Sequence, residues 1–137
     1  MKAQCEDRTC MLRKAFLGNA LFSTVSGLII LFAQRRVLGI LGLSNRINLT
    51  MLGAALIIFA AMLVINAHRQ QVKISDAWVG VLMDLGWVVG TVVAIFTVPF
   101  STQGKWVVIG IADVVLLFAM LQFLGLRRIQ KAGQLAR

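Results

Sequence analysis

Two aspartates, Asp84 and Asp113, stand inside long apolar stretches of the sequence. An ionised carboxylate is costly in hydrocarbon, so an aspartate in a membrane-spanning segment faces the interior of the bundle, pairs with another group or is protonated. Such a carboxyl can carry a proton or a cation through the membrane. It can equally be a structural group that holds helices together by hydrogen bonds. The residue types alone leave both interpretations open.

Other polar residues recur at helical spacing near these aspartates. Asn19, Ser23 and Ser26 follow i, i+4, i+7 spacing and therefore share one face of a helix. Asp84 and Thr91 are seven residues apart and also share a face. The sequence thus predicts an intramembrane polar site built from several helices.

Helical rise sorts these residues by depth. At about 1.5 Å per residue, the aspartates lie about 9 Å apart along the membrane normal, too far to share a proton directly. The predicted site therefore has two layers. The inner layer contains Asn19, Ser23 and Asp84, and the outer layer contains Ser26, Thr91 and Asp113.

Four apolar runs must position these residues. The chain has 137 residues, of which 59% are hydrophobic and 14% charged, whereas soluble domains carry about 25% charged residues. Each run has about the 20 residues that cross the hydrocarbon core as a helix. We expect an all-α, polytopic membrane protein with one domain over residues 1–137, in a left-handed antiparallel bundle. The predicted spans are residues 15–33, 48–66, 77–100 and 106–126, between tails 1–14 and 127–137.

The distribution of Lys and Arg predicts the orientation. Ten of the 14 basic residues lie in the two tails and the second loop, and four lie in the first and third loops. The positive-inside rule therefore places both termini in the cytoplasm. The Arg35–Arg36 pair in the first loop opposes this assignment.

The formal net charge of +9 does not indicate nucleic-acid binding, because the basic residues lie at the helix ends, where they meet lipid headgroups. The lipid bilayer is the expected partner. Gly86 and Gly90 form a GxxxG match, a candidate face for helix packing or for a dimer. A homodimer or a larger membrane complex would use this face.

No pattern in the sequence predicts catalysis, a metal site or a cofactor. Cys5 and Cys10 are a C-x4-C pair, but a zinc site needs four ligands and His68 is the only histidine. The serines in the spans have no histidine base nearby in the sequence. The protein is therefore not expected to be an enzyme.

The connections and the end of the chain carry further predictions. Residues 37–43 are apolar but too short to span, which indicates an interfacial or partly re-entrant turn. Residues 130–137 are expected to be a frayed polar tail. Gln122 follows Asp113 by nine residues, half a turn off its face, and is expected near the cytoplasmic interface.

Two segments 65 residues apart are alike: Asn19-x-x-Phe22-x-x-x-Ser26 and Asp84-x-x-Trp87-x-x-x-Thr91. A parallel repeat of two helices would explain the likeness. So would chance, because apolar helices have similar compositions.

One group of proteins shares several of these sequence features: the run Asn19-Ala-Leu-Phe-Ser23 with Ser26-Gly27, the segment Leu41-Gly42-Leu43, and Asp84-Leu-Gly-Trp87 with Gly90. On these residues the chain resembles a group of uncharacterised small bacterial integral membrane proteins with four helices. The resemblance implies a bacterial inner-membrane protein and carries no activity or site residues. Two functions are expected from the sequence as a whole: a non-enzymatic structural or accessory membrane component, or a small proton- or cation-coupled transporter or channel that uses Asp84 and Asp113.

Overall fold

The computed structural model describes residues 2–44, 48–69 and 74–135, and within these the side chains of residues 10–131. The described chain forms five α-helices and no strand. They are α1 (Lys2–Phe32), α2 (Gln34–Leu41), α3 (Thr50–His68), α4 (Ile74–Thr97) and α5 (Thr102–Leu135).

Four of these helices, α1, α3, α4 and α5, are long and apolar enough to cross a membrane. The prediction of an all-helical chain with four helices long and apolar enough to span a membrane is therefore confirmed for the described residues. The apolar windows of α3 and α4 cover Thr50–His68 and Ile74–Thr97, within three residues of the predicted spans. Hydropathy alone located them, because a lipid-exposed helix must be apolar on nearly all sides.

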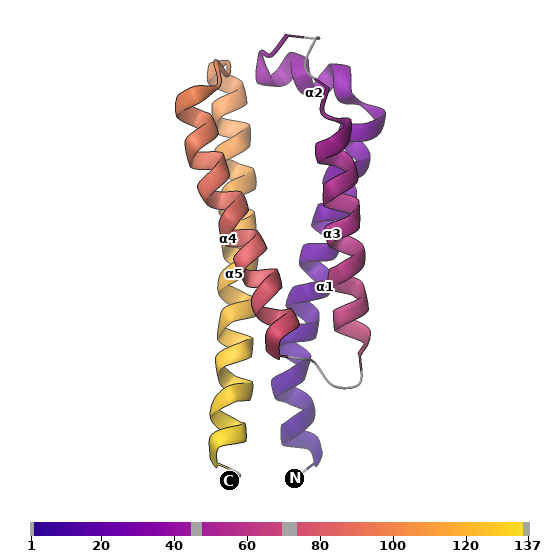
Figure 1. Cartoon of the computed structure of the whole chain (residues 1–137), viewed down its shortest axis with the longest axis vertical. Coiled ribbons are helices and arrows are strands. Elements are labelled where there is room, and N and C mark those ends of the chain that lie inside the picture. Colours follow the sequence, from indigo (N-terminus) through magenta and orange to yellow (C-terminus); the bar gives the residue numbers. More distant parts are fainter. Residues whose placement is uncertain (1, 45–47, 70–73, 136–137) are drawn as a thin grey trace.

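The long helices pack as two antiparallel pairs, α1 with α3 and α4 with α5 (Figure 1). Both chain termini lie at one end of the molecule, here called the terminal end, and α2 lies at the opposite end (Figure 1). The two pairs meet in a buried core nearer the terminal end. This core consists of Leu12, Phe16, Ala20, Ala60, Leu63, Ala67, Ala77 and Leu126.

The prediction of a frayed tail over residues 130–137 is wrong for residues 130–135, because α5 continues to Leu135. Contacts between α1 and α5 at the terminal end support the extension. Leu12 and Leu126 are fully buried, and Arg128 Nη1 donates to Met11 Sδ at 3.6 Å. A Cβ built on Gly125 would lie 3.1 Å from Leu12 Cβ, so the glycine admits the neighbouring helix.

Glycines set the spacing of α1 and α3 nearer the α2 end. A Cβ built on Gly27 would lie 2.9 Å from the carbonyl oxygen of Gly53, and one on Gly53 would lie 2.9 Å from Leu31 Cγ. Small residues of this kind let helix backbones approach closely in membranes. The α1–α3 pair therefore depends on two glycines that the sequence interpretation did not single out as a pair.

The prediction of a turn over residues 37–43 is wrong for its first part, which belongs to α2. This helix ends at Gly42, whose positive φ of 72° is the left-handed conformation that glycine adopts at helix ends. Ser101, just before α5, binds the end of α2: its N–H donates to Leu41 O at 2.9 Å, and its Oγ donates to Ile40 O at 3.0 Å. At this end α2 therefore joins the two helix pairs.

Candidate functional site

Asp84 of α4 is a buried polar residue with hydrogen-bond partners on two other helices, and only 2% of its surface is exposed. Asn19 of α1 donates from Nδ2 to both carboxylate oxygens, at 3.0 Å to Oδ1 and 2.7 Å to Oδ2. Gln122 of α5 donates from Nε2 to Oδ2 at 2.8 Å. The carboxylate thus ties together three helices, including one from each helix pair.

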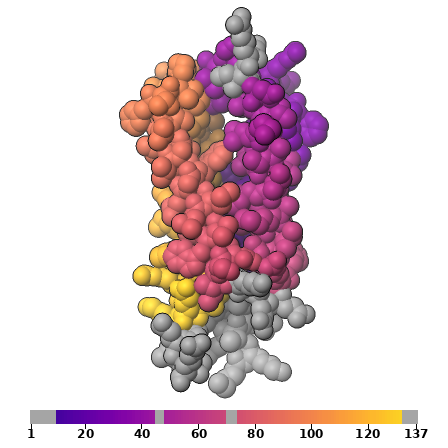
Figure 2. All heavy atoms as spheres, in the orientation of Figure 1, coloured from indigo at the N-terminus to yellow at the C-terminus, as the bar shows by residue number. Residues whose placement is uncertain are grey.

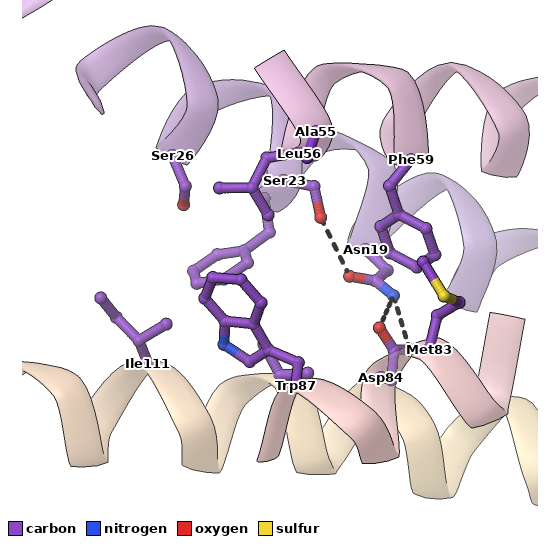
Figure 3. A pocket seen from close by; sticks show the side chains of 12 residues that line it. Asn19, Ser23, Ser26, Ala55, Leu56, Phe59, Met83, Asp84, Trp87 and Ile111 are labelled. Carbon is purple, nitrogen blue, oxygen red and sulfur yellow. Dashed lines mark hydrogen bonds between the residues drawn. The ribbon is translucent and has the colours of Figure 1, made fainter. Parts of the chain in front are cut away.

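Ser23 completes this group from the next turn of α1. Its Oγ donates to Asn19 Oδ1 at 3.4 Å, so the amide oxygen of Asn19 faces the serine and its NH2 group faces Asp84 (Figure 3). Both residues are buried. We call Asn19, Ser23, Asp84 and Gln122 the Asp84 cluster.

The charge of Asp84 has no basic counterpart in the described structure. The ion pair found among the described residues joins Arg69, just after α3, to Asp76 in the first turn of α4, at 2.6 Å. The partners of Asp84 are neutral amides, and each places an N–H against a carboxylate oxygen. Such N–H donors suit an ionised carboxylate, because its oxygens can only accept hydrogen bonds.

A cavity of about 110 Å³ borders the cluster between the two helix pairs. Three aromatic side chains line it with Asp84: Phe22 of α1, Phe59 of α3 and Trp87 of α4. Figure 3 labels Phe59 and Trp87. The rest of the wall is mostly apolar. It consists of Asn19, Ser23, Ser26, Ala55, Leu56, Met83, Ile111 and Val115.

The cavity has in its wall a hydrogen-bond donor without a partner among the described residues, and the molecular surface is hollowed on one side of it. The indole Nε1 of Trp87 is buried and has no acceptor within the described chain, so it is free to donate to a bound molecule. The molecular surface is also hollowed between α3 and α4, in the half nearer α2 (Figure 2). Exposed Ala55 of α3 and Met83 of α4 line the cavity on this side.

The structure brings the residues of the predicted inner layer together, since Asn19, Ser23 and Asp84 are all members of the cluster. It does not assemble the predicted outer layer. Ser26 lines the cavity, whereas Thr91 is half-buried and outside it. Asp113 is exposed on the far side of α5 and makes no hydrogen bond or ion pair with the described residues.

Gln122 is the member of the Asp84 cluster that the sequence interpretation left out of the predicted site. Its expected depth near the cytoplasmic interface stays a prediction, but its full burial against Asp84 was not expected. A signal was present in the sequence: α5 carries two stripes at spacings of three and four residues, and small alanines mark one of them. That stripe is the buried one and contains Ala112, Val115, Ala119, Gln122 and Leu126.

The remaining candidates lie away from the cluster. Gly86 and Gly90 are exposed, and a Cβ built on either meets nothing within 4 Å, so their role as a dimer face stays a prediction. Cys10 is a free thiol, and the side chain of Cys5 lies outside the described residues. The described residues contain no group of three His, Cys, Asp or Glu side chains that could hold a metal ion.

No protein-family model, no curated protein and no solved structure matches this chain. The resemblance to small bacterial four-helix membrane proteins therefore stays a prediction, and the function must be argued from the site itself.

Proposed function

We propose that the protein is a small membrane carrier that binds a monovalent organic cation at Asp84. One observation supports this most strongly: a buried carboxylate with no basic partner in the described chain lies in the wall of an aromatic cavity between two helix pairs. In this proposal the protein is a multi-pass protein of the bacterial inner membrane with both termini in the cytoplasm.

The charge of the ligand follows from the charge of the site. The low dielectric of a membrane interior strengthens the attraction between a carboxylate and a cation. The aromatic faces of Phe22, Phe59 and Trp87 carry negative quadrupole charge, and they attract a cation as well. Every charged or aromatic group in the cavity wall therefore favours a positive ligand.

The class of cation follows from the few oxygen ligands that the site offers. Hard cations such as Ca²⁺ take six to eight oxygens, and Mg²⁺ six. Here the carboxylate already accepts from Asn19 and Gln122, and the other oxygens in the wall are those of Asn19, Ser23 and Ser26. A weakly hydrated organic ammonium needs no oxygen shell and packs against apolar walls. The site therefore favours an organic cation over a metal ion.

The cavity volume limits the size of the ligand. Sites for drug-sized molecules measure about 300–1,000 Å³, whereas this cavity measures about 110 Å³. A small quaternary ammonium is the matching size. Tetramethylammonium is therefore the probe of choice.

Transport requires that the cavity open alternately to the two sides of the membrane, and the architecture offers a route. The cavity lies between the α1–α3 and α4–α5 pairs, where rocking of one pair against the other would change access. The core cluster closes the terminal end, and the Ser101 contacts to α2 join the pairs at the other. These Ser101 contacts are the ones that must break for the cavity to open toward α2.

A second candidate function is a structural or accessory membrane component, and one observation favours it. The three N–H contacts to Asp84 already join α1, α4 and α5 without a ligand. Under this alternative the cluster specifies helix packing only. The chain would then bind no cation.

Equilibrium binding separates the two candidates. We expect purified protein in detergent to bind radiolabelled tetramethylammonium, and we expect Asp84→Asn to abolish binding while Asp113→Asn leaves it unchanged. The first variant keeps the side-chain shape but removes the charge in the cavity, and the second removes a charge outside it. Failure of the wild type to bind, or equal binding by all three proteins, would contradict the carrier proposal.

Misfolding of Asp84→Asn would obscure that result, so a second variant tests the site without touching the cluster. Trp87→Leu removes one aromatic face and retains the carboxylate. We expect it to weaken binding by a factor of about 2 to 30, the equivalent of a cation–π contact of about 0.5–2 kcal/mol. Unchanged affinity would exclude Trp87 from the site.

A further inference from the structure

The predicted spans contain two acidic residues, Asp84 and Asp113, and Asp113 does not line the cavity. It lies on the opposite side of α5 from Gln122. The two positions are nine residues apart, which turns Gln122 half a turn away from the face of Asp113. Asp113 is exposed, whereas Gln122 is fully buried. The surface around Asp113 is therefore independent of the Asp84 cluster.

Around Asp113 the exposed side of α5 repeats with alternating spacings of four and three residues, the period of a helix-packing seam. A Cβ built on Gly110, the position before Asp113 in this stripe, meets nothing within 4 Å, so a neighbouring backbone can approach there. We call these residues the Asp113 face. Its members are Trp106, Gly110, Asp113, Leu117, Met120 and Leu124.

The depth of Asp113 makes its exposure unusual. It lies 11 residues from the start of α5 at Thr102 and about 10 Å inside the predicted span 106–126, which is well within a hydrocarbon core about 30 Å thick. Aspartates at this depth almost always face the protein interior or a water-filled cavity and pair with another group. On a single chain this one faces outward among apolar side chains.

A second copy of the chain does not supply the missing charge. All 14 Lys and Arg residues lie outside the predicted spans, and Lys14, Lys105 and Arg127 border them. Lys105 and Arg127 flank Asp113 on α5 at about 12 Å and about 21 Å along the helix. A parallel second copy would place its Asp113 at the same depth, where the like charges repel.

We propose that the Asp113 face docks a transmembrane helix of a different membrane protein, which carries a lysine or arginine at mid-membrane depth. The carboxylate and the basic side chain neutralise each other in the contact, and Gly110 allows the two backbones to approach. The apolar members of the face provide the remaining contact area. The cation-binding proposal for Asp84 does not enter this inference.

Synthetic helices test the docking in lipid vesicles. The probes are two peptides: a leucine-rich spanning helix with one lysine at its centre, and the same helix with leucine in that position. Energy transfer from a donor dye on Cys10 of Cys5→Ser protein to an acceptor on the peptide reports association. We expect the lysine peptide to associate about tenfold more tightly than the leucine peptide, as a strong interhelical polar contact allows.

Two variants of the protein assign the preference to Asp113. Asp113→Asn should lose the preference for the lysine peptide, and Asp113→Lys should instead prefer a peptide with a central aspartate. Leu117→Asn, one turn further along the same face, is the matched control and should keep the lysine preference. Because these residues are exposed, the substitutions leave the described core intact.

Three outcomes would overturn the proposal. Equal association of the lysine and leucine peptides would show that charge does not drive docking. Retention of the preference by Asp113→Asn would place the contact elsewhere. Energy transfer between donor- and acceptor-labelled copies of the protein, abolished by Asp113→Asn, would show that a second copy occupies the face.

Discussion

At the scale of single residues, the Asp84 cluster is a buried carboxyl group surrounded by neutral amide donors. Amide groups from α1 and α5 satisfy the carboxylate without neutralising its charge. A lysine in place of either amide would have formed an internal ion pair, and a cation from outside would then gain little. The cluster thus joins the helices, and in the carrier proposal its carboxyl, which has no basic partner in the described chain, is what attracts the ligand.

The hydrogen bond from Gln122 should contribute measurably to stability. Gln122→Leu removes the donor and leaves a similar apolar volume, so we expect the free energy of unfolding to fall by about 1–3 kcal/mol. Thr91→Val is the matched control, because Thr91 is half-buried and makes no hydrogen bond through its side chain in the described structure. Unfolding with SDS in mixed micelles, followed by tryptophan fluorescence, measures both variants. Equal effects of the two would contradict a structural role for Gln122.

The depth of each polar residue along its helix could be predicted from the sequence. The direction in which its side chain faces could not. Helical rise alone grouped Asn19, Ser23 and Asp84, because residues at one depth on adjacent helices can meet. The same arithmetic placed Asp113 with Ser26 and Thr91, since it does not fix how α5 is rotated about its axis. Packing fixes the rotation: the stripe with Ala112 and Ala119 is turned inward, where small side chains permit close contact.

At the scale of elements, some glycines lie where two helices pack closely together, and others lie on a free helix surface. Gly27 and Gly53 hold α1 against α3, whereas Gly86 and Gly90 open onto free space in the single chain. The GxxxG pattern drew attention to the second pair, because sequence spacing does not say which glycine faces a neighbour.

This difference gives a paired prediction. Gly27→Ala brings a methyl group within 2.9 Å of the Gly53 carbonyl oxygen, and we expect a loss of about 1–3 kcal/mol in the free energy of unfolding from overpacking. Gly86→Ala meets no atom and should leave stability unchanged or raise it by up to about 1 kcal/mol, through the higher helix propensity of alanine. The same SDS titration measures both. A large loss for Gly86→Ala would show that this face is packed against another chain.

The long helices could be predicted from composition, and α2 could not. A run of about 20 apolar residues has no stable alternative to a helix in lipid. Residues 34–41 contain two arginines and Gly39, and Gly42 follows them. Tertiary contacts stabilise their helix, since Ser101 donates hydrogen bonds to the carbonyl oxygens of Ile40 and Leu41. Such contacts between distant segments are not visible in local sequence.

At the scale of the whole molecule, the two similar segments, 65 residues apart in the sequence, lie one in each helix pair. The equivalent positions Asn19 and Asp84 are bonded to each other, and Phe22 and Trp87 both line the cavity. Matched positions that meet at an interface are what a parallel repeat would produce. Thr91 does not follow the pattern, since its counterpart Ser26 lines the cavity and Thr91 does not.

The orientation in the membrane is a prediction at this scale. Both termini lie at one end of the molecule (Figure 1), and the charge distribution predicts that this end faces the cytoplasm. In a chain with both native cysteines replaced by serine, we expect a membrane-impermeant maleimide to label Gln103→Cys but not Lys131→Cys in intact cells. Permeabilised cells should show labelling at both positions. Labelling of Lys131→Cys alone in intact cells would invert the topology.

Flux through reconstituted protein tests the central claim most directly. Proteoliposomes with an inside-negative potential are given radiolabelled tetramethylammonium, and uptake is compared among wild type, Asp84→Asn, Asp113→Asn and empty liposomes. The carrier account predicts saturable uptake by wild type and Asp113→Asn, with uptake by Asp84→Asn at the level of empty liposomes. Uptake by Asp84→Asn equal to wild type, or none by wild type, would contradict it.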